Sequence, residues 1–273
     1  TLSCKAMRTK RFLTLLILFL SGTFAYSQLT VTITTAESDP TNSSPFVVTI
    51  EFSGGSPVTG FELTDITVGN GVASNLVSGS NPSFTVDITP AGDGSVTVDV
   101  GADVIDDVGG NSAAPQFSIA FDGTSPATPT VTPLTTNDDT PTITGTATVG
   151  AGEALTVTVN SVTYTEGDGN LSLTGTDWTL VIPGGNALGD GTYEVEATVT
   201  DAATNSSTDA TSNELVVDTS NPATPTVTPL TTNDDTPTIT GTATVGAGET
   251  LTVTVNSVTY TEGDGNLSLS GTD

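Results

Sequence analysis

The chain has 273 residues, with 31 acidic and 4 basic side chains and no histidine, which gives a formal net charge of −27. All of the basic residues precede position 12, and all of the acidic residues follow position 36. Binding a nucleic-acid backbone requires cationic side chains that neutralise phosphates, so nucleic acid is excluded as a partner. Cations are the natural partners of such a surface, and the simpler interpretation of the charge is solubility.

The composition indicates an all-β protein without disulfides. Short runs of Val, Ile and Leu alternate with Thr and are separated by Gly, Pro, Asn and Asp. No stretch after residue 28 has a sustained helical period. The one cysteine, Cys4, precedes the expected start at Met7, so the mature chain contains no thiol.

Residues 1–27 are predicted to be a secretory signal peptide, preceded by extraneous residues before Met7. A basic stretch, MRTKR, is followed by the apolar run FLTLLILFL and then by small residues up to Ser27. The apolar run is shorter than the roughly 20 residues that a membrane span needs, so no transmembrane segment is expected. The protein is therefore expected to be secreted, with Gln28 as its first residue.

Residues 28–123 are predicted to form the first domain. Apolar residues alternate with polar ones, which places one face of each strand inward. The expected strands are 29–34, 46–52, 61–68, 72–77, 84–89, 95–100 and 116–122. Short strands at this spacing, with Gly-rich turns between them, favour a β-sandwich.

Residues 124–219 are predicted to form a second sandwich, which begins with a stiff Pro/Thr-rich join, TSPATPTVTP. The expected strands are 130–132, 142–147, 155–160, 162–165, 171–173, 178–182, 192–200 and 214–217. Asn160 and Ser161 are expected to make a tight turn. Trp178 is expected in the core rather than as a sugar-binding platform, and Tyr193 is expected to form a tyrosine corner with its ring buried.

The stretch 126–177 occurs a second time at 222–273, with Thr250 in place of Ala154 and Ser270 in place of Thr174. The second copy stops just before the equivalent of Trp178. Residues 220–273 are therefore predicted to be an incomplete third domain that is poorly stable alone, because half a sandwich leaves one sheet uncovered. More repeats are expected downstream.

Several motifs resemble the bacterial Ig-like domains that stand in tandem in large surface adhesins. In the second domain these are TPTITGT at 140–146, DGTY at 190–193 and TVTDAATN at 198–205, where the family commonly has Gly in place of Thr204. The first domain is similar to a related Ig-like group through PF at 45–46, PVTGF at 57–61, DITV at 65–68 and NGVASN at 70–75. The resemblance implies tandem Ig-like β-sandwiches and is specific for fold, because such modules occur in proteins of many functions.

The residue inventory argues against an enzyme. Without His, and without Cys or Lys after processing, the usual nucleophile–base pairs and His/Cys zinc sites cannot form. Calcium, which takes oxygen ligands, is the better chemical hypothesis. The Ig-like arrangement gathers acidic loops at the domain junctions, where they should repel one another unless cations bind.

The candidate calcium ligands are Asp122, Glu153, Asp201 and Asn205 at the first junction, where the first domain adds Asp39 and Asp93, and Asp218, Glu249, Asp138, Asp139 and Asp190 at the second. The alternative is that these are solvated turn residues, because Asp and Asn are favoured in turns anyway. Both interpretations are open at this point.

The sequence thus predicts a non-catalytic extracellular stalk or adhesive array at a bacterial cell surface, with calcium as a candidate stiffener of its junctions. One alternative is that these modules are spacers of a secreted enzyme or polysaccharide-binding protein whose working domain lies downstream. Another is that the first domain itself binds an extracellular glycan or protein.

Overall fold

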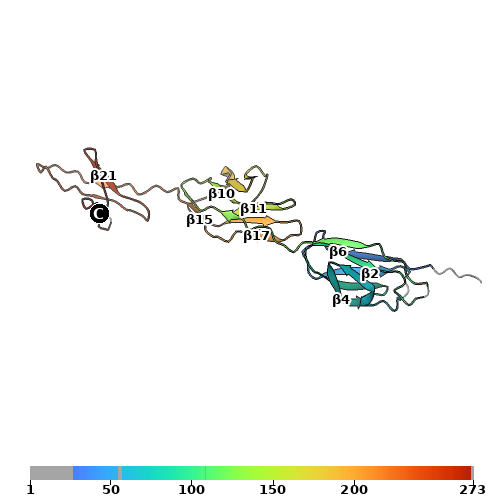
Figure 1. Ribbon diagram of the computed structural model, residues 1–273. Coiled ribbons are helices and arrows are strands. Elements are labelled where there is room, and N and C mark those ends of the chain that lie inside the picture. Colours follow the sequence, from blue (N-terminus) through green and yellow to red (C-terminus); the bar gives the residue numbers. More distant parts are fainter. Residues whose placement is uncertain (1–26, 55–56, 108, 272–273) are drawn as a thin grey trace, which may run out of the picture. The chain divides into compact units, whose positions relative to one another are not determined.

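The computed structural model describes residues 27–54, 57–107 and 109–271, and over these residues the protein is all-β (Figure 1). It divides into two compact units, one ending at Gly123 and the other beginning at Thr124. The predicted signal peptide lies outside the described residues except for Ser27. Within the described part, no helix is long and apolar enough to cross a membrane.

The first unit is a sandwich of two antiparallel sheets. Its elements are β1 (Val31–Thr35), β2 (Phe46–Phe52), the 3-10 turn η1 (Leu63–Asp65), β3 (Ile66–Gly69), β4 (Gly71–Ser78), β5 (Ser83–Pro90), β6 (Gly94–Val100) and β7 (Phe117–Phe121). One sheet has the order β1-β2-β5-β4 and the other β3-β6-β7. The predicted alternation is confirmed, since every second residue of β2, from Phe46 to Phe52, is buried.

An aromatic cluster fills part of this core. The rings of Phe52 and Phe61 meet edge to face at a centroid distance of 5.0 Å, and Phe61 meets Phe84 in the same way at 5.1 Å. Such edge-to-face pairs add to the stabilisation that burial alone provides. Phe61 comes from the loop before η1, so this loop is held to the core by its side chain.

The prediction of one strand over 61–68 is wrong in its first half. Residues 63–65 form η1, in which the Asp65 carboxylate accepts a hydrogen bond from the Glu62 backbone N–H at 2.8 Å. A side chain that bonds to nearby backbone competes with strand pairing. The strand β3 therefore begins only at Ile66.

The second unit opens with another sandwich. Its elements are β8 (Thr130–Val131), β9 (Leu134–Thr136), β10 (Thr142–Thr146), β11 (Ala154–Val159), β12 (Val162–Thr165), β13 (Leu171–Thr174), β14 (Asp177–Val181), the 3-10 turn η2 (Gly184–Asn186), β15 (Gly191–Tyr193), β16 (Val195–Thr200), β17 (Ser206–Thr208) and β18 (Leu215–Val217). The sheet orders are β13-β14-β10-β8, β12-β11-β16-β17 and β15-β18-β9, with β9 and β18 parallel. The sequence did not predict β9 or β17.

The predicted strand 192–200 is divided at Glu194, because β15 pairs with β18 whereas β16 pairs with β11. Just after the break, the N–H of Val195 donates to the Glu214 carboxylate at 3.2 Å. Glu214 is buried, and its second oxygen has no hydrogen-bond partner. This side chain therefore satisfies a backbone group at the point where the chain changes sheets.

Trp178 is fully buried, which confirms its prediction as a core residue. Its indole N–H donates to the Thr130 carbonyl at 3.1 Å. Its ring lies over Gly145, its register partner in β10, where a Cβ would overlap both the indole and the Thr130 carbonyl. The close approach of β8, β10 and Trp178 thus requires a glycine at position 145.

Two predicted local motifs are present. Asn160 and Ser161 have φ values of 49° and 65° and connect β11 to β12, which confirms the tight turn. The Tyr193 hydroxyl donates to the Gly189 carbonyl at 2.9 Å, as expected of a tyrosine corner. The Tyr193 ring is half-buried rather than buried, so that part of the prediction is wrong.

Residues 220–271 repeat the first half of this sandwich with fewer strands. These are β19 (Thr226–Val227), β20 (Gly241–Thr242), β21 (Thr252–Val255) and β22 (Val258–Thr261). The side chains of this stretch are mostly exposed. Ile239 is 41% exposed, whereas its equivalent Ile143 is 1% exposed, and Val227 is 64% exposed, whereas its equivalent Val131 is 6% exposed. Nearly identical sequences therefore differ in burial, because the second domain also has β14 to β18.

Candidate functional site

The acidic residues near the start of the second domain lie in loops that the structure brings together. Ala154 at the start of β11 pairs with Thr200 at the end of β16, so the loops that carry Glu153 and Asp201 are neighbours. Glu153 accepts a hydrogen bond from the Gly150 N–H at 2.7 Å. Asp122 belongs to the first unit, where its N–H donates to the Thr41 carbonyl at 2.9 Å.

The loop 201–205 is closed by its own side chains. The two Asp201 carboxylate oxygens accept from the Asn205 backbone N–H at 2.8 Å and from its side-chain amide at 2.9 Å. The Asp201 N–H donates to the Asn205 carbonyl at 3.0 Å. In this geometry the Asp201 carboxylate holds the turn, which is the ordinary role of Asp in loops.

Replacing Thr204 with glycine is expected to stabilise the second domain by about 0.5–1 kcal/mol. Thr204 has a φ of 72°, in the left-handed region that costs an L-residue with a side chain roughly 1–2 kcal/mol. Glycine removes this cost but adds chain entropy to the unfolded state, so part of the gain is lost. Urea denaturation followed through Trp178 fluorescence measures the change. An unaltered midpoint would contradict the expectation, and the exposed neighbour Ala202, changed to glycine, is the control.

The acidic residues near the end of the second domain also gather. The Asp218 N–H donates to the Thr136 carbonyl at 2.9 Å, and the Leu188 N–H donates to the Asp139 carbonyl at 2.7 Å. This places the segments that carry Asp138 and Asp139 beside those that carry Asp190 and Asp218. Glu249, from the third segment, accepts from the Gly246 N–H at 2.6 Å within its own loop.

Among these residues, Asp190 has the carboxylate that accepts the most hydrogen bonds. It accepts from the Ser220 hydroxyl at 2.5 Å, and from the Thr219 hydroxyl and N–H at 2.6 and 2.7 Å. These bonds, the Ser220 hydroxyl first, lower the pKa of Asp190 to about 2. Ser220 also donates its N–H to Asp218 at 3.1 Å, so both carboxylates hold the start of the following segment.

This lowered pKa predicts that acid releases residues 219–220. The contribution of Asp190 is fully present above the pKa of an unfolded aspartate, about 3.9, and is lost as the pH falls through about 2. The amide resonance of Thr219, whose N–H bonds Asp190, should titrate with a midpoint near pH 2 in wild type. It should show no such titration in D190N, while D138N, at a carboxylate that bonds Thr140 instead, should titrate like wild type.

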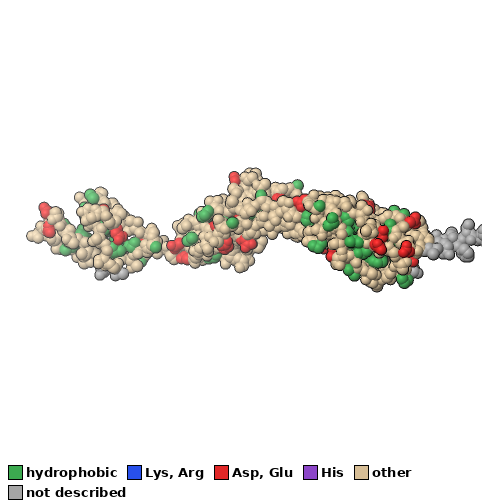
Figure 2. Space-filling view, turned by 60° about the horizontal axis from the view of Figure 1, so that its bottom comes forward, with side chains coloured by type: hydrophobic (Ala, Val, Ile, Leu, Met, Phe, Trp, Pro, Cys, Tyr) green, Lys and Arg blue, Asp and Glu red, His purple; other side chains and the backbone are tan. Residues whose placement is uncertain are grey.

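No group of three or more acidic side chains within the described residues has the geometry of a metal site. The structure brings the loop of Glu153 beside that of Asp201, and the segment of Asp138 and Asp139 beside those of Asp190 and Asp218. The carboxylates of Glu153, Asp201, Asp138, Asp190 and Asp218 accept from nearby backbone, amide or hydroxyl groups. The face seen in Figure 2 carries acidic side chains and, on the described residues, no basic ones. A cation would have to compete with these local hydrogen bonds.

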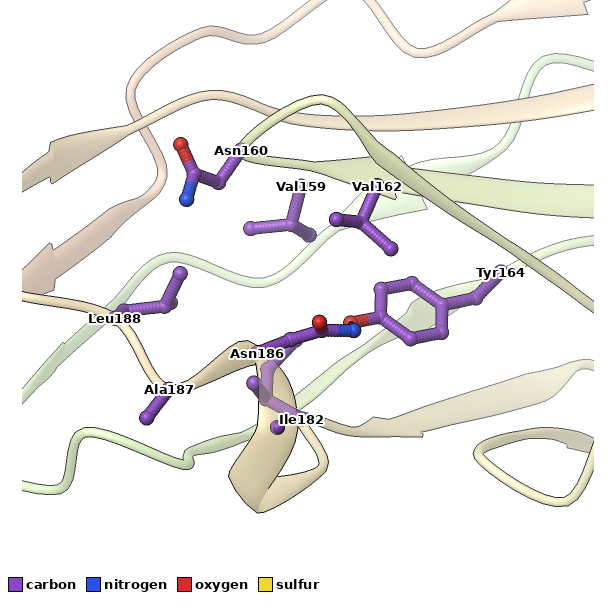
Figure 3. A pocket seen from close by; sticks show the side chains of 9 residues that line it. Val159, Asn160, Val162, Tyr164, Ile182, Asn186, Ala187 and Leu188 are labelled. Carbon is purple, nitrogen blue, oxygen red and sulfur yellow. Dashed lines mark hydrogen bonds between the residues drawn. The ribbon is translucent and has the colours of Figure 1, made fainter.

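A small cavity of about 240 Å³, which the sequence did not reveal, lies beside the Asn160–Ser161 turn of the second domain (Figure 3). Apolar side chains, including Val159, Ile182 and Leu188, line it. At its side, the Asn186 amide donates to the Tyr164 hydroxyl at 2.9 Å. It lies below the usual ligand-pocket range of about 300–1,000 Å³ and has no charged lining residue.

Residues 26–125 match the sequence model of a bacterial Ig-like domain family, and residues 131–219 match a second family with the same description. Over residues 26–219 the chain belongs to the bacterial Ig-like domains, as its motifs predicted. Domains of this kind are generally non-catalytic and are typically extracellular or surface-associated. No curated protein sequence matches the chain significantly.

Several solved structures resemble this chain with low sequence identity and low TM-scores. A chimeric titin Z1Z2-Z1Z2 tandem is 16% identical with a TM-score of 0.26, over 70% of this chain and 97% of that one. SGBP-B of a Bacteroides ovatus mixed-linkage glucan utilization locus, in complex with a heptasaccharide, is 16% identical with a TM-score of 0.23, over 71% of this chain and 45% of that one. These scores are too low to support an argument about function.

Proposed function

We propose that the chain is a non-catalytic extracellular structural or adhesion module, a stalk or adhesive array of Ig-like sandwiches on a secreted bacterial surface protein. The main support is that two successive Ig-like domains each have a separate buried core. Each domain is thus able to act as a separate rigid unit, and the number of copies sets the length of the array. The residue inventory, with no His and no Lys or Arg after residue 11, supports the absence of catalysis.

The length of the array tests this proposal. Inserting a further copy of residues 124–219 into a protein of residues 27–219 should raise the maximum dimension in small-angle scattering by a constant increment per copy. A dimension that stays constant, because the domains collapse onto one another, would contradict a stalk. Glycan-array binding by residues 27–123 would instead assign adhesion to the first domain, and catalysis by a domain downstream would favour the spacer alternative.

We further propose that calcium stiffens the junctions, supported by the two clusters of acidic loops in the second domain. Extracellular calcium modules bind with dissociation constants of about 10⁻⁴–10⁻³ M. At a hundredfold excess over that constant, one site contributes about 2.7 kcal/mol, which raises the melting temperature by several degrees. Calorimetry on residues 28–220 with calcium and with a chelator measures this increase.

D201N and D190N each remove a carboxylate charge from one cluster, and they should reduce the calcium-dependent increase at the corresponding site. The increase, rather than the melting temperature itself, is the readout, because Asp201 and Asp190 also hold their loops. Identical melting curves with calcium and chelator would show that the acidic loops serve solubility and turn formation alone.

A further inference from the structure

We propose that the second domain binds an arginine side chain of a basic partner protein in a groove beside Tyr193. The groove has a volume of about 310 Å³, at the lower end of the usual ligand-pocket range of about 300–1,000 Å³. It shares only Asn160 with the cavity in Figure 3. Its lining combines an aromatic ring, two carboxylates, an amide and hydroxyl groups, which belong to Tyr193, Glu194, Glu196, Asn160, Ser161 and Thr192.

The groove lies where the chain changes sheets. Tyr193 is the last residue of β15, which pairs with β18, whereas Glu196 belongs to β16, which pairs with β11. Glu196 is the register partner of Thr158, close to the end of β11 that leads into the Asn160–Ser161 turn. The backbone of the sandwich thus brings the aromatic ring, both carboxylates and the turn to one place.

The two carboxylates of the groove have oxygens available for a ligand. Glu196 is exposed, and its carboxylate accepts no hydrogen bond from the described residues. Glu194 accepts from the Asn213 N–H at 2.9 Å through one oxygen, and its other oxygen has no donor among the described residues. The domain supplies no cation of its own, because no Lys, Arg or His follows residue 11. A cationic ligand is therefore the electrostatic complement of this groove.

The ring of Tyr193 favours arginine over other cations. Its hydroxyl donates to the Gly189 carbonyl at 2.9 Å, so the half-buried ring is held in one orientation before a ligand binds. A guanidinium is planar, stacks on aromatic rings and donates two parallel hydrogen bonds to a carboxylate, whereas the ammonium of lysine is a compact, strongly hydrated charge. Calcium takes six or more oxygen ligands, and these two carboxylates belong to no larger acidic group within the described residues.

A neutral glycan is the competing ligand for a groove that contains an aromatic ring and hydroxyl groups. Two carboxylates without a compensating cation favour the basic ligand, and the acidic surface of the whole chain attracts basic partners over a distance. This inference does not depend on the stalk proposal, because a groove on one domain binds its ligand whatever the length of the array.

NMR titration of residues 27–273 with the tripeptide Gly-Arg-Gly, blocked at both termini, tests the inference. Amide resonances of residues 160–161 and 192–196 should shift and saturate. The tripeptide with lysine in place of arginine should bind at least about threefold more weakly, because an ammonium cannot stack or donate in the same planar geometry. Raising the ionic strength from about 0.02 M to about 0.5 M should weaken the binding of the arginine peptide, because salt screens exposed charges.

Matched variants separate the groove from the net charge. E196Q should weaken binding about threefold to fivefold, in the range of an exposed ion pair. E166Q makes the same change of charge at an exposed residue that follows β12, outside the groove, and should leave binding unchanged. Y193L should weaken binding at least about threefold, whereas Y193F, which keeps the ring and loses only the bond to Gly189, should bind like wild type. Trp178 fluorescence reports that the second domain of each variant is folded.

Four results would overturn the inference. Equal losses in E196Q and E166Q would mean that the attraction is a diffuse effect of the net charge. Equal affinity for the lysine peptide, or equal losses in Y193F and Y193L, would mean that the ring does not select a planar cation. Shifts confined to residues outside the groove would place the site elsewhere. Shifts at 192–196 with a neutral glucan oligosaccharide, but not with the arginine peptide, would assign the groove to a glycan.

Discussion

Replacing Gly145 with valine is expected to lower the stability of the second domain by about 3–5 kcal/mol, the range found when a large core side chain is lost. The indole of Trp178 and the Thr130 carbonyl occupy the space that a side chain at this position would need. The indole is also hydrogen-bonded to that carbonyl, so it cannot move without losing the bond. Either β8 leaves the sheet or Trp178 leaves the core, and both outcomes expose apolar surface.

Thermal unfolding of residues 27–273 followed through Trp178 fluorescence measures this loss, which should lower the melting temperature by more than about 10 °C for a domain of this size. Gly184 has open space around it and serves as the matched control, since G184A should change stability by less than about 0.5 kcal/mol. A G145V protein that melts like G184A would show that β8 and Trp178 do not depend on the small residue between them.

The fold was predictable from the sequence where apolar and polar residues alternate regularly, and where a turn depends on the residues within it. The alternating run from Phe46 to Phe52 predicted β2 correctly, and the Asn160–Ser161 pair predicted its turn. The break at Glu194 was not predictable, because alternation continues through Tyr193 and Val195 although the partner strand changes. That change depends on Glu214, which is distant in sequence and is positioned only by the complete fold.

The candidate site was predictable in part for the same reason. Loop position in an Ig-like sandwich gathers Glu153 near Asp201, and Asp190 near Asp218. The direction in which each carboxylate points was not predictable, because it depends on donors such as Ser220 and Gly150 that become neighbours only in the folded loops. Calcium must displace these donors in order to bind, and calorimetry with calcium and with a chelator measures whether it does.

Replacing Ile143 with alanine is expected to cost the protein about 2–5 kcal/mol, whereas the same replacement at Ile239 should cost less than about 0.5 kcal/mol. The two residues stand in the same local sequence, TPTITGT, and have the same intrinsic strand preference. Ile143 is 1% exposed and pairs with Leu180 across the sheet, whereas Ile239 is 41% exposed. The difference between the two costs therefore isolates the contribution of the back half of the sandwich.

Urea denaturation of both variants of residues 27–273, followed by Trp178 fluorescence for the second domain and by far-ultraviolet circular dichroism for the whole chain, measures both costs. I143A should shift the midpoint seen by both probes, and I239A should shift neither by a measurable amount. Equal shifts in the two variants would contradict this expectation, because they would mean that residues 222–271 bury Ile239 in solution as completely as the second domain buries Ile143.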